Sequence, residues 1–130
     1  MYKRQVLHDA SGGGVPDIIL LASGSEVALA MEAHERLVSE GVRSRLVNMA
    51  SMRLFEQQDA DYRESVLPPS CSTRLAVEAG VSFGWERWTG DGGQVIGVDH
   101  FGASAPAGVL FEQFGFTADA VYARAKALLA

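Results

Sequence analysis

The stretch that decides the fold is IILLASGSEVALAMEAHERLVSEG, residues 18–41. Its first five residues form a continuous apolar run, which is bounded by Pro16-Asp17 before it and by Ser23-Gly24-Ser25 after it. A run of this kind is typical of a strand that is buried on both faces, as in a parallel sheet. The sequence therefore predicts a central strand over 18–22.

An amphipathic helix is predicted directly after this strand. Ser23 and Glu26 have the spacing of a capping box, and Gly41 stands where the helical pattern stops. The residues that recur on one face at steps of three and four are Val27, Ala30, Met31, His34, Leu37 and Val38. Because His34 lies on this mainly apolar face, we expect it to be a core histidine with one hydrogen-bond partner.

The same alternation continues outward from this unit. Further strands are predicted at 44–48, 73–77 and 94–98, and residues 5–8 can add an edge strand. Residues 54–66 carry a broken helical pattern, which Leu67-Pro68-Pro69 closes. Such an alternation predicts a mostly parallel sheet that is covered by helices on both faces.

Two further helices are predicted near the C-terminus. A short one spans 106–114 and is ended by Gly115. Thr117 can cap the last helix, whose apolar face is made of Val121, Tyr122, Ala125, Leu128 and Leu129. We therefore expect the C-terminal helix to be docked on the rest of the domain.

Length and composition point to one domain of a cytoplasmic protein. The chain has 130 residues, 48% of them apolar, and a formal charge of −5, which argues against disorder and against nucleic-acid binding. Its single cysteine, Cys71, cannot form an internal disulfide and has no neighbours at zinc spacing. No apolar run approaches the roughly 20 residues that cross a bilayer, so no membrane partner is expected.

Few residues carry a chemical signal. The turn Ser23-Gly24-Ser25 offers backbone N–H groups at a helix N-terminus, but it lacks the lysine of a phosphate loop, so a capping role is favoured. His100 follows the strand at 94–98 and is the better functional candidate among the three histidines. Phe83, Trp85 and Trp88 form an aromatic group that reads equally well as core or as a covered interface.

Several segments together resemble one family, the C-terminal domain of transketolase, in the order and at the spacing of that family. The resemblance covers nearly the whole chain, about residues 6 to 129. The segments YRESVLP at 62–68 and FGASAP at 101–106 are the most specific. The segments are ASGSEV at 22–27, QD at 58–59 with YRESVLP at 62–68, AVEAG at 76–80, FGASAP at 101–106 and LFEQFGFT at 110–117.

The resemblance implies a fold in more detail than the pattern does. It implies a three-layer α/β/α domain around a five-stranded mixed sheet with strand order 1-3-2-4-5, in which strand 1, near Val6 and Leu7, is antiparallel to the others. In that order the turns Ser23-Gly24-Ser25 and Glu78-Ala79-Gly80 face each other at the carboxyl ends of the strands, where open α/β sheets bind ligands. The sequence thus predicts a weak anion crevice at Ser23, Gly24, Ser25 and Gly80.

The resemblance also implies a function that this chain does not perform alone. Transketolases move a two-carbon ketol unit from a ketose phosphate to an aldose phosphate in the pentose phosphate pathway. In that family, thiamine diphosphate and a divalent cation, Mg or Ca, lie between two other domains at the dimer interface. We therefore expect no catalytic, cofactor-binding or metal-binding residue here, an inactive isolated chain, and the remaining transketolase domains of a homodimer as partners.

Alternatives of other kinds remain open from sequence. The β subunits of 2-oxoacid dehydrogenases and deoxyxylulose-phosphate synthase end in a domain of the same fold, although FGASAP at 101–106 argues against them. A free-standing domain that binds a small regulatory ligand is another option, and a module that only organises a dimer is a third. The chain can be a fragment, an expressed domain or half of a split enzyme.

Overall fold

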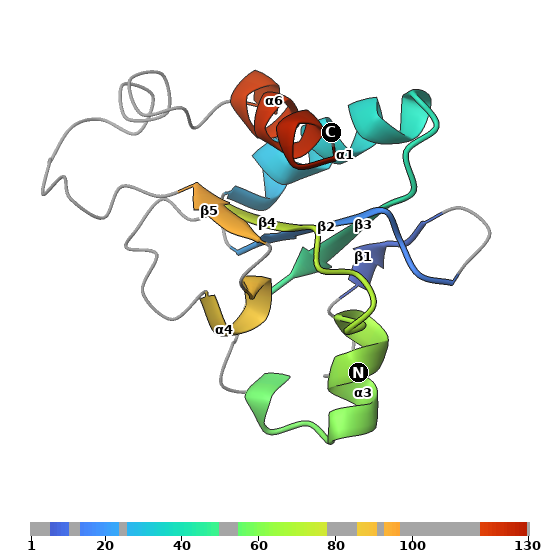
Figure 1. The fold of residues 1–130 in the computed structure, drawn as a ribbon. Coiled ribbons are helices and arrows are strands. Elements are labelled where there is room, and N and C mark those ends of the chain that lie inside the picture. The colour runs from blue at the N-terminus through green and yellow to red at the C-terminus, as the bar shows by residue number, and fades with distance from the viewer. Residues whose placement is uncertain are drawn as a thin grey trace, which may run out of the picture.

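In the computed structural model, the chain folds into a five-stranded sheet that lies between two layers of helices (Figure 1). The structure describes residues 6–10, 14–23, 26–49, 55–77, 86–90, 93–96 and 118–129. The strands are β1 (Val6–His8), β2 (Ile18–Ala22), β3 (Ser44–Asn48), β4 (Arg74–Val77) and β5 (Gln94–Ile96). The helices are α1 (Glu26–Ser39), α3 (Ala60–Val66), α4 (Glu86–Thr89) and α6 (Ala118–Leu129).

The strand order is β1-β3-β2-β4-β5, which confirms the order that the resemblance implies. β1 runs antiparallel to β3, and the pairs β3–β2, β2–β4 and β4–β5 are parallel. β2 is the central strand, and all five of its residues are fully buried, as the unbroken apolar run predicts.

One face of the sheet is covered by the two long helices, α1 and α6 (Figure 1). Leu37 of α1 and Val121 of α6 are fully buried there against β2, β3 and β4. The predicted docking of the C-terminal helix is thereby confirmed, whereas Val38 is 40% exposed and does not share the buried face of α1 as the periodicity predicts. Val38 lies at the edge of the buried stripe, where the helix has already turned toward water.

Gly41 ends α1, as its position in the sequence predicts. Its φ is +86°, a left-handed conformation that favours glycine. The N–H of Gly41 donates to the Val38 carbonyl, and the N–H of Val42 donates to the Leu37 carbonyl. These two bonds satisfy carbonyl groups that the end of a helix leaves without a partner.

The opposite face is covered by shorter elements, α3 and α4 (Figure 1). Its core is more varied than that of the first face, and its buried members are Ile19, Leu21, Val47, Met49, Phe55, Val66, Leu67, Cys71, Ala76 and Trp88. The broken pattern at 54–66 resolves into α3, which begins after Asp59, whose carboxylate accepts a hydrogen bond from the Tyr62 N–H. Because this helix is short, the carbonyl groups at its C-terminal end need hydrogen-bond donors from outside the helix.

Candidate functional site

The predicted anion crevice falls at the carboxyl ends of β2 and β4. Ala22 of β2 pairs with Val77 of β4, so these two strand ends lie side by side. Ser23 follows Ala22 directly, and its carbonyl accepts a hydrogen bond from the Glu26 N–H at the start of α1. Gly24, Ser25 and Gly80 lie outside the described residues, so the crevice stays a prediction.

The predicted aromatic surface is described at one residue. Trp88, in α4, is only 6% exposed, and its ring meets that of Phe55 edge-on with 5.0 Å between centroids. Phe55 in turn meets Tyr62 of α3 at 6.1 Å. Phe83 and Trp85 lie outside the described residues, as does His100. Trp88 therefore belongs to the core of the α3 and α4 face, and an interface role for the group as a whole stays a prediction.

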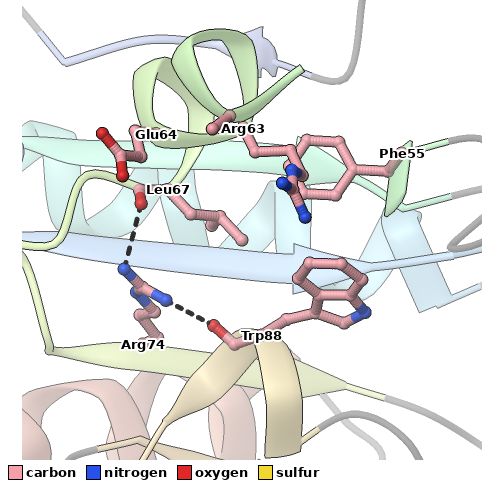
Figure 2. Close-up of a pocket in the computed structure, with 7 residues that line it drawn as sticks. Phe55, Arg63, Glu64, Leu67, Arg74 and Trp88 are labelled. Atoms are coloured by element: carbon pink, nitrogen blue, oxygen red, sulfur yellow. Dashed lines mark hydrogen bonds between the residues drawn. The ribbon is translucent and has the colours of Figure 1, made fainter. Parts of the chain in front are cut away.

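A pocket of about 290 Å³ opens beside Trp88, between α3, α4 and β4 (Figure 2). Apolar side chains and two arginines form its walls, and the lining residues are Phe55, Ala60, Arg63, Glu64, Leu67, Arg74 and Trp88. The lining comes from Phe55, from residues 60–67, from β4 and from α4, which are brought together by the packing of this face of the sheet.

Arg74 of β4 holds the walls of this pocket together. Its guanidinium donates to four backbone carbonyls, those of Leu67, Pro68, Cys71 and Trp88, at 3.2, 3.0, 2.9 and 2.6 Å. Two of these bonds appear in Figure 2. Since Leu67 follows α3 and Trp88 lies in the single turn of α4, Arg74 supplies donors to the ends of both helices.

Arg45 of β3 does the same for the last turn of α3. One of its terminal nitrogens donates to the carbonyls of Ser65 and Val66, at 2.8 and 2.9 Å. Its other nitrogens bind both carboxylate oxygens of Asp9, at 2.8 and 3.3 Å. Partial burial alone would raise the pKa of Asp9, but the hydrogen bonds from Arg45 and from the Ala10 N–H, with the nearby charges, outweigh it and lower that pKa.

Arg63 of α3 differs from these two arginines. Its backbone belongs to the helix, but across the described part of the chain its guanidinium makes no hydrogen bond or ion pair. Its Nε–H is shielded from water without an acceptor. Figure 2 shows the side chain extending from α3 toward Phe55 and Trp88, inside the pocket.

His34 is the core histidine that the helix pattern predicts. It is 5% exposed, and its Nδ1 lies 2.8 Å from the Ser44 hydroxyl. Burial, assisted by His8 at 5.6 Å between ring centroids, lowers the pKa of His34, although Glu35 opposes this effect. One hydrogen-bond partner and a disfavoured charge fit a structural histidine.

Cys71 is a free, buried thiol on the α3 and α4 face. Its Sγ lies 3.7 Å from the Thr73 carbonyl, and burial raises the pKa of the thiol. A thiol of this kind is held in its protonated form and is a poor nucleophile.

Among the described residues, no three His, Cys, Asp or Glu side chains come together in a way that could hold a metal ion. The same part of the chain contains no helix with the length and apolar character of a membrane span.

Sequence reasoning did not single out Arg45, Arg63 or Arg74. Arg45 and Arg74 each lie in a strand whose other residues are mostly buried, in the segments SRLVN and RLAV. An arginine in such a strand is a usable signal, because a charged group of this size is buried only where acceptors surround it. For Arg63 the sequence contains no comparable signal.

Comparisons with known proteins agree on one family. The model of the transketolase-like TK C-terminal domain matches residues 4–117. Transketolase 1 of Escherichia coli is 52% identical over 124 residues, which are 95% of this chain and 18% of that protein. The chloroplastic transketolase of Solanum tuberosum is 47% identical over 121 residues, which are 93% of this chain and 16% of that protein.

A solved structure shows the same similarity in three dimensions. The transketolase from Leishmania mexicana superimposes with a TM-score of 0.83 at 40% identity, covering 95% of this chain and 17% of that one. The chain thus spans less than a fifth of the length of these relatives. Since the family model and the relatives all match across nearly the whole sequence, the chain belongs to the family of transketolase-like C-terminal domains.

Proposed function

We propose that this chain serves as the C-terminal domain of a transketolase, which transfers a two-carbon ketol unit from a ketose phosphate to an aldose phosphate in the pentose phosphate pathway. The observation that carries the proposal is the family match over residues 4–117. Because the chain spans 18% of the E. coli relative, the activity is proposed for an enzyme that contains this domain and further ones.

Within that enzyme, we assign this domain a structural role. Three buried polar side chains serve the fold itself: Arg45 and Arg74 donate to carbonyls at helix ends, and His34 lies within hydrogen-bond distance of Ser44. Thiamine diphosphate and a divalent cation, Mg or Ca, are then held by the other domains, and the chain alone neither binds the cofactor nor transfers a ketol unit. We expect Phe83 and Trp85 of the predicted interface to pack against those domains in a cytoplasmic homodimer, whereas Trp88 is only 6% exposed and lies in the core of the α3 and α4 face.

At the strand ends near Ser23, Gly24, Ser25 and Gly80, we expect anion binding to be millimolar at best. The helix N-terminus favours an anion by about 0.3–1 kcal/mol, and the carboxylates of Glu26 and Glu78 oppose it by a similar amount. Titration with phosphate, AMP and ATP, followed through the amide shifts of these four residues, tests this expectation. Saturation below about 100 μM would contradict it.

A domain exchange tests the proposed function. The corresponding C-terminal segment of E. coli transketolase 1 is replaced by residues 4–129 of this chain, and ketol transfer from xylulose 5-phosphate to ribose 5-phosphate is measured. We expect the hybrid to be active and the same enzyme without any C-terminal domain to be much less active. A folded hybrid that binds thiamine diphosphate but is no more active than the truncated enzyme would contradict the proposal.

A further inference from the structure

The pocket between α3 and α4 is not explained by the proposed role. Its volume of about 290 Å³ is near the lower end of the range of small-molecule sites, roughly 300–1,000 Å³. Phe55, Leu67 and Trp88 form its apolar lining, and each of them is less than 10% exposed. Sites of this kind bind a small molecule on their apolar lining and fix its orientation with a few polar groups.

The two arginines of the pocket have different roles. Arg74 is largely used, because its guanidinium, which has five N–H donors, already makes four hydrogen bonds to backbone carbonyls of the domain. The guanidinium of Arg63 has no acceptor among the residues that the structure describes, although its Nε–H is shielded from water. A cation held in this way is a strong donor for a carboxylate or a phosphate, which it can bind through two parallel N–H groups.

Glu64 also lines the pocket, and its charge opposes an anion. Figure 2 shows Glu64 and Arg63 pointing to opposite sides of the pocket, with the rings of Phe55 and Trp88 on the side of Arg63. An anionic group beside Arg63 therefore has the cation and both aromatic rings close to it, with the carboxylate of Glu64 on the far side.

We propose that this pocket binds a small, flat organic anion, whose carboxylate or phosphate pairs with Arg63 and whose ring packs among Phe55, Leu67 and Trp88. The site needs only residues of this chain, so it can be tested without the domains to which the proposed function assigns ketol transfer. Carboxylate and phosphate ligands share the chemistry that Arg63 recognises, and the probes below distinguish them.

The test is a titration of the ¹⁵N-labelled chain with benzoate, phenyl phosphate and inorganic phosphate in parallel, followed by NMR. The signals to follow are the Nε–H of Arg63 and the indole N–H of Trp88. We expect both to shift in a saturable way with benzoate or phenyl phosphate, with a Kd on the order of 1 mM. Inorganic phosphate, which lacks a ring, is expected to bind at least tenfold more weakly.

Matched variants of neighbouring residues on α3 assign the effect to the site. Arg63→Met is expected to weaken binding of the better probe at least tenfold, and Arg63→Lys to weaken it less. Glu64→Gln removes the opposing charge and is expected to leave binding unchanged or strengthen it. If Arg63→Met does not fold, the Lys and Gln variants still separate the two charges.

Three outcomes would overturn the proposal. One is the absence of any shift at Arg63 and Trp88 up to 20-fold above the expected Kd. Another is binding of equal strength in the protein with Arg63 and in Arg63→Met. The third is inorganic phosphate binding as tightly as phenyl phosphate, because the aromatic walls would then contribute nothing.

Discussion

The two faces of the sheet are closed by different means. On the α1 and α6 face, two helices of 14 and 12 residues cover an aliphatic core. On the other face, α3 has seven residues and α4 has four, and the core contains Phe55, Trp88, Met49 and Cys71. The same strands serve both faces, because their side chains alternate between them.

The difference shows where the domain needs arginine. Every helix leaves its last four carbonyls without an internal partner, which is a small share of a long helix but half or more of a helix of one or two turns. Arg45 and Arg74 project from β3 and β4 and donate hydrogen bonds to these carbonyls. The stability of the α1 and α6 face, the aliphatic face, therefore depends on packing. The stability of the α3 and α4 face, the arginine face, depends on charged donors that reach backbone carbonyls.

The largest loss of stability is expected for Arg74→Met. Four carbonyls lose their donor, and each acceptor that stays buried costs about 1–3 kcal/mol, so the free energy of unfolding is expected to fall by about 3–5 kcal/mol. Urea unfolding followed by circular dichroism measures this loss.

Arg63→Met is the matched control for that experiment. It removes the same type of side chain from the same face, but the guanidinium of Arg63 makes no hydrogen bond or ion pair with any described residue. Its effect is expected to stay within about 0.5 kcal/mol. Equal losses for the two variants would show that loss of charge, rather than loss of donors, weakens this face.

On the aliphatic face, Leu37→Ala is expected to cost about 2–4 kcal/mol. Leu37 is fully buried between α1 and the sheet, and its truncation removes apolar contact and leaves a cavity. Because the loss comes from packing, Leu37→Met should recover most of it. Urea midpoints of the three proteins measure it, and a loss below about 1 kcal/mol for the alanine variant would mean that this face repacks easily.

A smaller effect is expected from pH through His34. Its pKa in the folded chain is below the ordinary value of 6.5 because it is buried, so the unfolded chain binds a proton more readily. This contribution to stability is complete above about pH 6.5 and is lost as the pH falls toward the lowered pKa. We expect urea midpoints to fall between pH 7.5 and 5.5, and to fall less in His34→Gln. An equal slope in both proteins would assign the pH dependence to other groups.

The smallest effect is expected at the surface between α1 and α6. Arg36 binds Asp119 at 2.6 Å, but Asp119 is 89% exposed at its side chain. Exposed pairs of this kind contribute about 0–1 kcal/mol and are screened by salt. Asp119→Asn should therefore lower the free energy of unfolding by no more than about 0.5 kcal/mol, and the difference should vanish in 1 M NaCl. A larger loss that persists in salt would show that the pair organises the docking of α6.

Much of the fold follows from local patterns in the sequence. The apolar run of β2, the stripe of α1 with its stop at Gly41, and the face of α6 all depend on near neighbours along the chain, and the structure confirms them. The order of the strands came from the resemblance, because periodicity does not say which strands pair.

The candidate pocket could not be predicted in the same way. Its walls come from Phe55, α3, β4 and α4, and a pattern over 10 or 20 residues does not show which of these segments meet. The same holds for Arg45, whose carbonyl acceptors lie 20 and 21 residues away. An arginine in a mostly buried strand indicates that acceptors surround it, but the sequence does not show which carbonyls these are.

The buried thiol of Cys71 allows the opening of the α3 and α4 face to be measured through its rate of chemical modification. It is the only cysteine of the chain, so any thiol reagent reports on this one position. Because the side chain is 4% exposed, alkylation requires a transient opening of the segment between α3 and β4. At reagent concentrations where closing outpaces labelling, the modification rate gives the population of the opened state. Alkylation of Cys71 therefore measures how often the segment that contains it opens.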